Sequence, residues 1–125
     1  MIVGTGIDIV EVKRVKYAID KWGNGFLKKV FTDEEIKYAK KRRFIFEHLA
    51  ARFALKEAVL KAFGYDKLSD WKNIEISNAK SGKPEIKLHG NLNKLKRVKK
   101  ISEIMVSMSH TKNYAVANAI LARRG

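Results

Sequence analysis

Residues 46–63 limit the fold of this chain more than any other segment, because they are apolar on nearly every side of a helix. At about 100° per residue, both one stripe and the side opposite to it are apolar. The stripe contains Phe46, Leu49, Ala50, Phe53 and Leu60, and the opposite side contains Ala51, Leu55, Ala58 and Val59. Gly64 follows, at a position where a left-handed residue commonly ends a helix. Such a helix is buried on both sides, and since one small sheet cannot cover it all, we expect copies of the chain to associate.

Shorter periodic patterns surround this long central helix. In the first half they predict a strand over residues 2–10, a helix from Glu11 that Gly23 and Gly25 end, and a helix from the capping box Thr32-Asp33-Glu34-Glu35 toward Lys41. In the second half they predict strands near residues 74–77 and 86–89 joined by a turn at 81–84, a short basic helix over 92–98, and final strands near 104–108 and 114–121.

The order of these elements, with helices grouped early and strands mostly late, predicts an α+β fold with an antiparallel sheet. The chain has 125 residues and no Pro-, Gly- or Ser-rich break, so we expect a single domain over residues 1–125. Hydrophobic residues make up 46% of the sequence, which is enough to form a core and argues against disorder.

Composition narrows the chemistry. Lys and Arg number 27 against 13 Asp and Glu, and the resulting charge of +14 favours anionic partners such as phosphate-rich cofactors, nucleic acid or an acidic protein. No cysteine is present, so any metal is bound by oxygen or imidazole ligands. There is no apolar run long enough to span a bilayer and no secretory signal at the start, so we expect a soluble cytoplasmic protein without membrane contact.

Two acidic residues lie where apolar ones would be expected. Asp8 interrupts the first strand, and Glu57 falls near the middle of the apolar stripe of the long helix. An ionised carboxylate in such a place needs a cation or hydrogen bonds. The simplest interpretation is an ion pair with Lys61, one turn further along the helix. The alternative is that the two carboxylates bind a hard divalent cation such as Mg²⁺, with phosphates and water completing its shell.

Two short motifs carry weaker signals. The sequence Ser107-Met108-Ser109-His110 ends a strand with alternating hydroxyls and an imidazole, which can bind phosphate or simply complete a hairpin. The sequence Gly82-Lys83-Pro84 is first of all a turn, although its glycine permits close backbone approach and its lysine suits a phosphate.

Taken together, four motifs resemble the holo-acyl-carrier-protein synthase family of phosphopantetheinyl transferases. They are Gly6-Ile7-Asp8-Ile9-Val10 with Arg14, the run from Arg52 through Lys56-Glu57 to Lys61-Ala62, Gly82-Lys83-Pro84, and Ser107-Met108-Ser109-His110. Their order and spacing match over nearly the whole chain. The sequence departs from the family after Gly64, where Tyr65-Asp66 replaces the usual Thr-Gly.

The resemblance implies a phosphopantetheinyl-transferase-like homotrimer with active sites between subunits. It implies transfer of the 4′-phosphopantetheine of coenzyme A to a serine of apo-acyl carrier protein, with release of adenosine 3′,5′-bisphosphate, in fatty acid biosynthesis. Asp8 and Glu57 would bind Mg²⁺, and Lys61 would stabilise the transferring phosphoryl group. Either Glu57 or a metal-bound water would deprotonate the serine. Arg14 would meet acidic residues of the carrier protein. The residues implied for binding the nucleotide and its phosphates are Arg52, Gly82, Lys83, Pro84, Ser109 and His110.

Two alternatives stay open at this point. A small nucleic-acid-binding protein would explain the charge and the Lys-rich segment 94–100, but it would give Asp8 and Glu57 no role. A broader transferase that serves peptide- or polyketide-synthase carriers is disfavoured by size, because such relatives resemble two fused copies of this unit.

Overall fold

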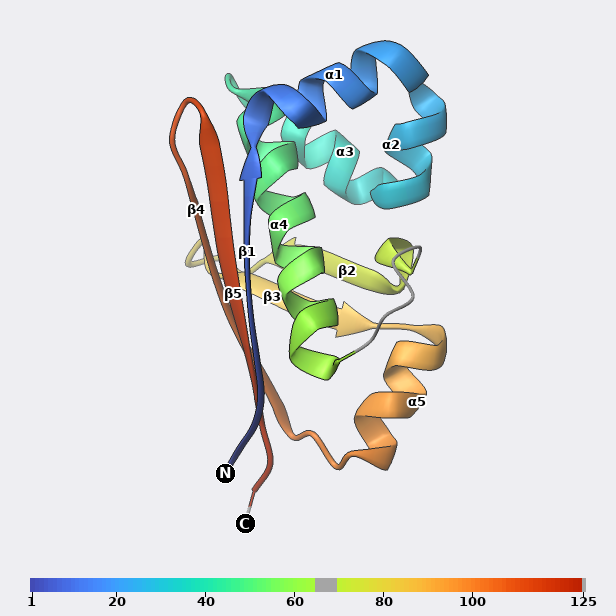
Figure 1. Ribbon diagram of the computed structural model, residues 1–125, viewed down its shortest axis with the longest axis vertical. Coiled ribbons are helices and arrows are strands. Elements are labelled where there is room, and N and C mark those ends of the chain that lie inside the picture. Colours follow the sequence, from blue (N-terminus) through green and yellow to red (C-terminus); the bar gives the residue numbers. More distant parts are fainter. Residues whose placement is uncertain (65–69, 125) are drawn as a thin grey trace.

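The computed structural model describes residues 1–64 and 70–124. A three-stranded antiparallel sheet in the order β1-β5-β4 forms one layer, and α4 lies across its inner face (Figure 1). The sheet consists of β1 (Ile2–Glu11), β4 (Glu103–His110) and β5 (Tyr114–Ala122). The helices are α1 (Val12–Trp22), α2 (Asn24–Val30), α3 (Asp33–Lys40), α4 (Ile45–Phe63), the 3-10 helix η1 (Trp71–Asn73) and α5 (Gly90–Val98). A separate antiparallel hairpin joins β2 (Ile74–Asn78) to β3 (Pro84–Leu88).

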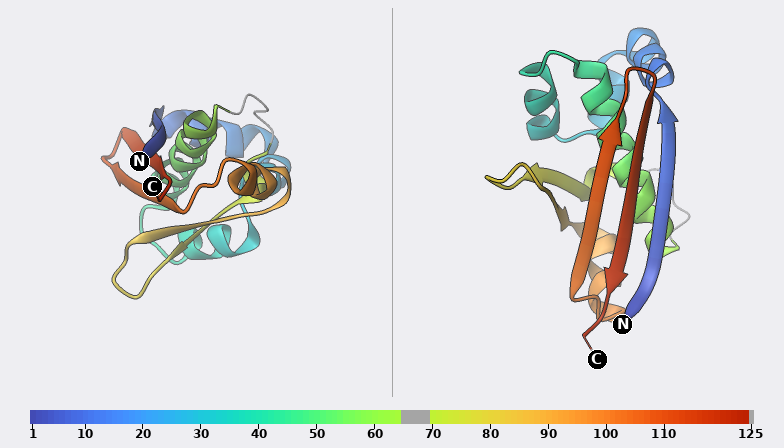
Figure 2. Two further views of the ribbon diagram at one scale, coloured as in Figure 1. Left: turned by 90° about the horizontal axis from the view of Figure 1, so that it is seen from below. Right: turned by 90° about the vertical axis from the view of Figure 1, so that its left-hand side faces the viewer.

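The arrangement confirms the predicted α+β fold with antiparallel sheets. Helices α1 to α3 cluster at one end of α4, the β2-β3 hairpin crosses behind α4 with β3 against β4, and α5 lies on the side of α4 away from the large sheet (Figure 1). Seen from its left-hand side, the molecule presents the three strands of the sheet in front and the helices behind them (Figure 2). None of the helices within residues 1–64 and 70–124 is long and apolar enough to cross a membrane.

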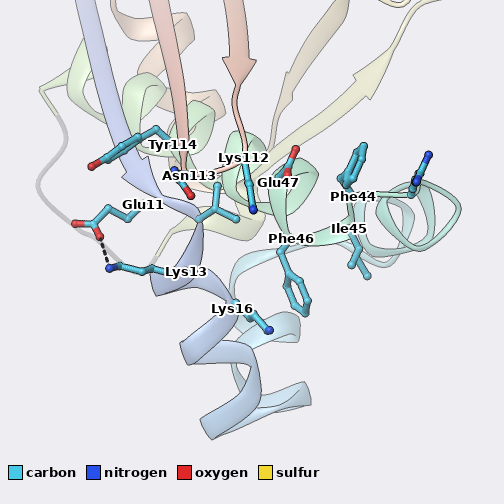
Figure 3. A pocket seen from close by; sticks show the side chains of 12 residues that line it. Glu11, Lys13, Lys16, Phe44, Ile45, Phe46, Glu47, Lys112, Asn113 and Tyr114 are labelled. Atoms are coloured by element: carbon cyan, nitrogen blue, oxygen red, sulfur yellow. Dashed lines mark ion pairs between the residues drawn. The ribbon is translucent and has the colours of Figure 1, made fainter.

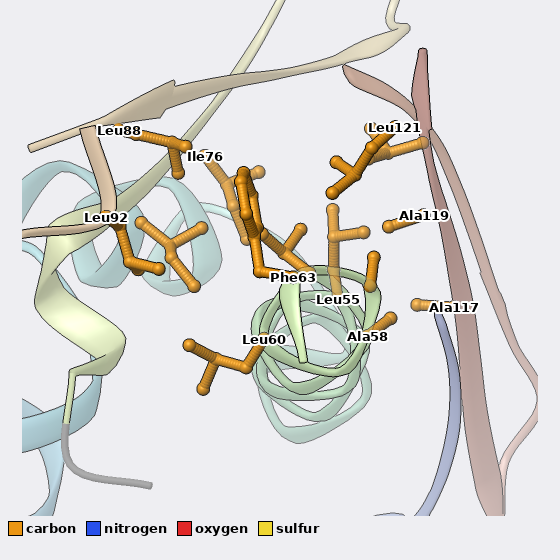
Figure 4. Close-up of a cluster of buried hydrophobic side chains, with 14 of the residues drawn as sticks. Leu55, Ala58, Leu60, Phe63, Ile76, Leu88, Leu92, Ala117, Ala119 and Leu121 are labelled. Atoms are coloured by element: carbon orange, nitrogen blue, oxygen red, sulfur yellow. The ribbon is translucent and has the colours of Figure 1, made fainter. Parts of the chain in front are cut away.

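Helix α4 is buried on both sides, as its sequence predicts. Ala58 packs toward the sheet, where Ala117 and Ala119 lie, while Leu60 faces the side of Leu92 (Figure 4). The expectation that a second subunit is needed to cover α4 is wrong, because the hairpin, α5 and the helical cluster cover its far side within one chain. Exposed apolar side chains lie instead on the outer face of the sheet, among them Ile7, Ile9 and Val116.

Local signals explain where the helices begin and end. The capping box is present, with Thr32 Oγ1 accepting from the Glu35 amide at 3.2 Å and Glu35 Oε1 accepting from the Thr32 amide at 2.9 Å. Gly64 adopts the left-handed conformation that was predicted to end the long helix (φ 64°, ψ 29°). Gly23 ends α1, but Gly25 lies inside α2, a seven-residue helix that the sequence did not predict.

Two glycines bring β1 against the backbone of α4. A Cβ atom at Gly6 would lie 2.0 Å from the Ala58 carbonyl oxygen, and one at Gly4 would lie 2.2 Å from the Ala62 carbonyl oxygen. Real Cβ atoms do not approach that closely, so only glycine permits this contact. The contact determines how near the residues of β1 come to those of α4.

A buried ion pair joins the helical cluster to the rest of the fold. Lys56 Nζ lies 2.6 Å from Glu35 Oε1, and neither side chain is exposed. The Lys56 ammonium also donates to the Val30 carbonyl oxygen at 2.7 Å, and Glu35 Oε2 accepts from the Ile76 amide at 2.7 Å. Because both charges are paired and hydrogen-bonded, their desolvation is offset, and the end of α2, the start of α3, β2 and α4 meet at one point.

We expect Lys56→Met to lower the free energy of unfolding by about 3–5 kcal/mol, because Glu35 would then remain buried without its cation. Urea denaturation followed by circular dichroism measures this change. The matched control is Lys13→Met, since Lys13 is 86% exposed and pairs only loosely with Glu11 at 3.9 Å. Its effect should stay within about 0.5 kcal/mol. Equal effects of the two substitutions would contradict the structural importance of the buried pair.

Candidate functional site

Asp8 and Glu57, the two acids in apolar segments, line one pocket. Asp8 lies on β1 opposite Ala117 of β5, and Glu57 lies on the face of α4 that β1 approaches. The pocket has a volume of about 440 Å³ and is also lined by Arg14 and Val15 of α1. The predicted convergence of the two carboxylates is therefore present in a single chain.

Lys61 binds Asp8 rather than Glu57. Its ammonium lies 2.9 Å from Asp8 Oδ1 and 3.1 Å from the Ile7 carbonyl oxygen. The ion pair between Glu57 and Lys61 that helical spacing suggested does not form among the described residues. The reason is the close approach of β1, which gives Lys61 a carboxylate and a carbonyl on the neighbouring strand. Lys61 remains about half exposed, so it can also meet a ligand.

Glu57 keeps a proton more readily than an ordinary glutamate. Partial burial raises the pKa of Glu57, and the nearby Asp8 carboxylate raises it further. The nearby Trp71 indole and the charge of Lys61 lower the pKa and offset part of this effect. The two carboxylates therefore repel each other, and a cation placed between them would relieve that repulsion.

The donor set suits a hard cation that brings other ligands with it. Within residues 1–64 and 70–124, no group of three or more His, Asp or Glu side chains could hold a metal ion. Asp8 and Glu57 supply carboxylate oxygens only, which Mg²⁺ prefers, and Mg²⁺ commonly keeps waters or substrate phosphates as its remaining ligands. The residues thus fit a magnesium ion shared with a phosphorylated substrate.

A second group of predicted site residues lies elsewhere around α4. Arg52 precedes Glu57 by five residues, or about 140° around the helix. Its Nη2 donates to Asn78 Oδ1 at 2.9 Å, and Asn78 Nδ2 donates to the Gly82 carbonyl oxygen at 2.9 Å. Arg52 is only 2% exposed, so in this structure its guanidinium contacts protein groups rather than solvent.

His110 belongs to the same region as Arg52. Its Nδ1 lies 3.1 Å from Glu47 Oε2, and its ring lies 5.0 Å from that of His48. His48 in turn contacts Tyr38, whose ring lies 4.2 Å from the Arg52 guanidinium. Burial lowers the pKa of His48, and the charges of His110 and Arg52 lower it further, which favours the neutral imidazole.

The remaining predicted residues are distributed around this region. Lys83 lies in the exposed turn after Gly82, and Pro84 begins β3. Ser109 is exposed on the outer face of the sheet, because successive strand residues point to opposite faces. One chain therefore brings Arg52 and the Gly82 turn together. Ser109, however, points to the opposite face of the sheet from His110. Tyr65-Asp66, where the sequence departs from the usual Thr-Gly of the family, lies outside the described residues.

Sequence reasoning missed a larger cavity of about 620 Å³ beside the start of α4 (Figure 3). Its lining combines the cations Lys13, Lys16, Arg43 and Lys112 with the aromatic side chains Phe44, Phe46 and Tyr114. The sequence shows a basic segment at residues 40–43. It does not indicate that α1 and the β4-β5 turn pack beside this segment and form a cavity with it.

Comparison with known proteins gives one family. The model of the 4′-phosphopantetheinyl transferase superfamily matches residues 4–119. A holo-[acyl-carrier-protein] synthase from Thermodesulfovibrio yellowstonii is 48% identical over 121 residues, which cover 97% of this chain and 99% of that protein. The crystal structure of holo-[acyl-carrier-protein] synthase from Neisseria meningitidis has a TM-score of 0.89 at 33% identity, covering 98% of this chain and all of that one. The synthase from Bacillus anthracis, crystallised with CoA (3′,5′-ADP), has a TM-score of 0.79 at 33% identity, covering 99% of each chain.

We expect Asp8→Asn to lower the pKa of Glu57, because the substitution removes the negative neighbour and frees Lys61. Carboxyl-carbon NMR titration of the protein without divalent ions measures this pKa. Glu103→Gln is the control, since Glu103 is exposed at the far end of β4 and should leave the pKa of Glu57 unchanged. An unchanged or higher pKa in the Asp8 variant would show that the two carboxylates are not coupled.

Proposed function

The chain belongs to the 4′-phosphopantetheinyl transferase superfamily, and on this premise we propose that it uses Mg²⁺, bound by Asp8 and Glu57, for the transfer reaction of that family. As a holo-acyl-carrier-protein synthase, it transfers the 4′-phosphopantetheine group of coenzyme A to apo-acyl carrier protein, a step that serves fatty acid biosynthesis. The observation that supports the metal proposal is the pair of carboxylates in one pocket beside Lys61. We further propose that the reaction takes place in the cytoplasm.

The residues of the pocket suit this phosphoryl transfer. The serine oxygen of the carrier protein attacks the phosphorus next to the pantetheine, and the bond to adenosine 3′,5′-bisphosphate breaks. Lys61, which is partly exposed and held by Asp8, donates to the phosphate oxygens on which negative charge develops. Bound Mg²⁺ would supply further charge neutralisation and align the pyrophosphate.

Glu57 is the group that we propose to accept the proton of the serine. Its carboxylate lines the same pocket as Asp8, where the phosphate would bind, so it is placed to reach the serine hydroxyl. The carboxylate has two oxygens, so it can bind a cation with one and accept the proton with the other. Arg14, in the lining of the same pocket, is suited to meet acidic residues of the carrier protein.

The nucleotide part of coenzyme A needs the second group of residues, which lies on another side of α4. We therefore propose a homotrimer in which the pocket of one subunit is completed by the Gly82-Lys83-Pro84 turn and His110 of a neighbour, with the buried Arg52 behind the turn. Ser109, on the outer face of the sheet, would lie near this interface. Two β1 residues on that face, Ile7 and Ile9, are each 65% exposed, as expected of a surface that another subunit covers.

The charge of +14 fits this function without nucleic acid, and the nucleic-acid-binding alternative is not favoured. Coenzyme A is polyanionic, and a positive field raises its local concentration and the rate of its encounter with the protein. The broader transferase alternative is also disfavoured, because the chain matches the Thermodesulfovibrio yellowstonii synthase over nearly the full length of both proteins.

The decisive test mixes purified protein, coenzyme A, Mg²⁺ and apo-acyl carrier protein and follows phosphopantetheine addition by mass spectrometry. We expect Asp8→Ala and Glu57→Ala each to slow transfer on the order of a hundredfold or more, because the charge stabilisation at the phosphate is lost. Glu103→Ala should react at the wild-type rate.

A second measurement tests the metal independently of activity. Mg²⁺ should raise the melting temperature of the wild type, since an ion that binds only the folded state stabilises it, and this shift should vanish in Asp8→Ala and Glu57→Ala. The shift should also shrink as the pH falls through the raised pKa of Glu57, because protons compete with the ion. Undiminished transfer and an unchanged Mg²⁺ shift in both variants would refute the assignment.

The trimer proposal predicts a solution mass of about three times 14.3 kDa for the wild type. Ile7→Glu should shift the protein toward monomers, because a charge on the outer face of the sheet would be buried without a partner. The control is Val98→Glu, since Val98 is even more exposed, at 77%, but lies on α5. Light scattering coupled to size exclusion measures both masses. A monomeric wild type, or an Ile7 variant of unchanged mass, would contradict the proposal.

A further inference from the structure

Two consecutive hydrogen bonds link α4 to the turn between β2 and β3. Arg52 Nη2 donates to Asn78 Oδ1, and Asn78 Nδ2 donates to the Gly82 carbonyl oxygen, both at 2.9 Å. A guanidinium can only donate and a carbonyl oxygen can only accept, so a single orientation of the Asn78 amide satisfies both partners. The amide is therefore fixed at its two ends.

Arg52 is held by the protein itself. Its guanidinium lies 4.2 Å from the centre of the Tyr38 ring, and Nη1 donates to the His48 carbonyl oxygen at 3.5 Å. With 2% of the residue exposed, Arg52 reaches no solvent-filled space from which a ligand could approach. Its influence on a bound molecule therefore has to pass through the groups that it holds, and Asn78 is the one that leads to an exposed turn.

The turn needs such support because its internal bonds fix its shape but not its position. The Gly82 amide donates to the Ala79 carbonyl oxygen at 2.8 Å, and the Ala79 amide donates to the Lys83 carbonyl oxygen at 2.9 Å. Gly82 has a φ of 89°, a conformation that other residues rarely adopt. These contacts close the turn on itself, whereas the bonds through Asn78 connect it to the buried part of α4.

We propose that Asn78 and Arg52 are positioning residues for coenzyme A, which hold the Gly82-Lys83-Pro84 turn at a fixed place relative to α4. The proposal rests on the proposed function, in which this turn binds the nucleotide part. The resemblance implied no role for Asn78. It implied that Arg52 contacts the nucleotide, whereas here Arg52 acts on the ligand only through Asn78. Loss of the Asn78-Gly82 bond should weaken binding of coenzyme A without slowing the chemical step.

Asn78→Asp separates this role from a purely structural one. The aspartate keeps the shape of the side chain and the contact with Arg52, but it replaces the Nδ2 donor by an acceptor that faces the Gly82 carbonyl oxygen. We expect the KM for coenzyme A to rise about three- to tenfold, the effect of one lost hydrogen bond, with kcat changed less than about twofold. The melting temperature should not fall, since Arg52 gains a carboxylate partner.

Asn78→Ala tests whether the effect comes from the lost donor or from the added charge. This variant also lacks the donor but carries no charge, so its KM for coenzyme A should rise as well. Asn91→Asp, on the exposed surface of α5, adds the same charge elsewhere and should keep the wild-type KM. A raised KM in Asn78→Asp alone would mean charge repulsion and would overturn the inference. Should Asn78→Ala fail to fold, the aspartate variant and the amide-exchange measurement still decide.

Amide hydrogen exchange provides a readout that does not depend on the proposed function. In Asn78→Asp the amides of Gly82 and Lys83 should exchange faster, while the Ile76 amide, which Glu35 holds, should keep its protection. If the wild type transfers phosphopantetheine but the variant keeps its KM, the inference fails and the function stands. If the wild type transfers nothing, the proposed function fails, and unchanged exchange in the variant would remove the positioning role too.

Discussion

The contact between β1 and the backbone of α4 is the constraint on which the site depends. Gly4 and Gly6 leave no room for a side chain, because a Cβ atom at either position would collide with a carbonyl oxygen of the helix. This approach puts Asp8 in the pocket that Glu57 lines and gives Lys61 a carboxylate partner on the neighbouring strand. Without the two glycines, Asp8 would lie farther from Glu57 and Lys61, which share one side of α4.

Helix α4 arranges its polar residues in two rows, each with a different task. Arg52 and Lys56 are four residues apart and share one side, where both are buried and bonded to other parts of the protein. Glu57 and Lys61 have the same spacing on another side and face the pocket or solvent. Arg52 and Lys56 join the hairpin and the helical cluster to the helix. Glu57 and Lys61 therefore project from a rigid support.

Much of this arrangement could be predicted from local signals. The capping box at Thr32 and the left-handed Gly64 depend on neighbouring residues only, and the acids at Asp8 and Glu57 were conspicuous because charge is costly in apolar segments. The partner of Lys61 could not be predicted, since it depends on how closely a distant strand approaches. The same holds for Asn78, whose two hydrogen bonds join segments that the sequence keeps apart.

Self-association was expected because α4 is apolar on both sides, but this reason is wrong. The structure directs attention to another surface, the outer face of the sheet. Because the hairpin and the helical cluster cover α4 within one chain, the helix itself needs no partner. The outer face of the sheet is the surface that we propose another copy covers, since it carries exposed apolar residues such as Ile7 and Val116 in place of the polar ones usual on a solvated face. The two groups of site residues lie on different sides of α4, so a chain of this size cannot surround one extended ligand with both. Packing copies through the open sheet face would solve both problems at once, because it would cover the apolar strands and bring the pocket of one chain toward the hairpin turn of the next.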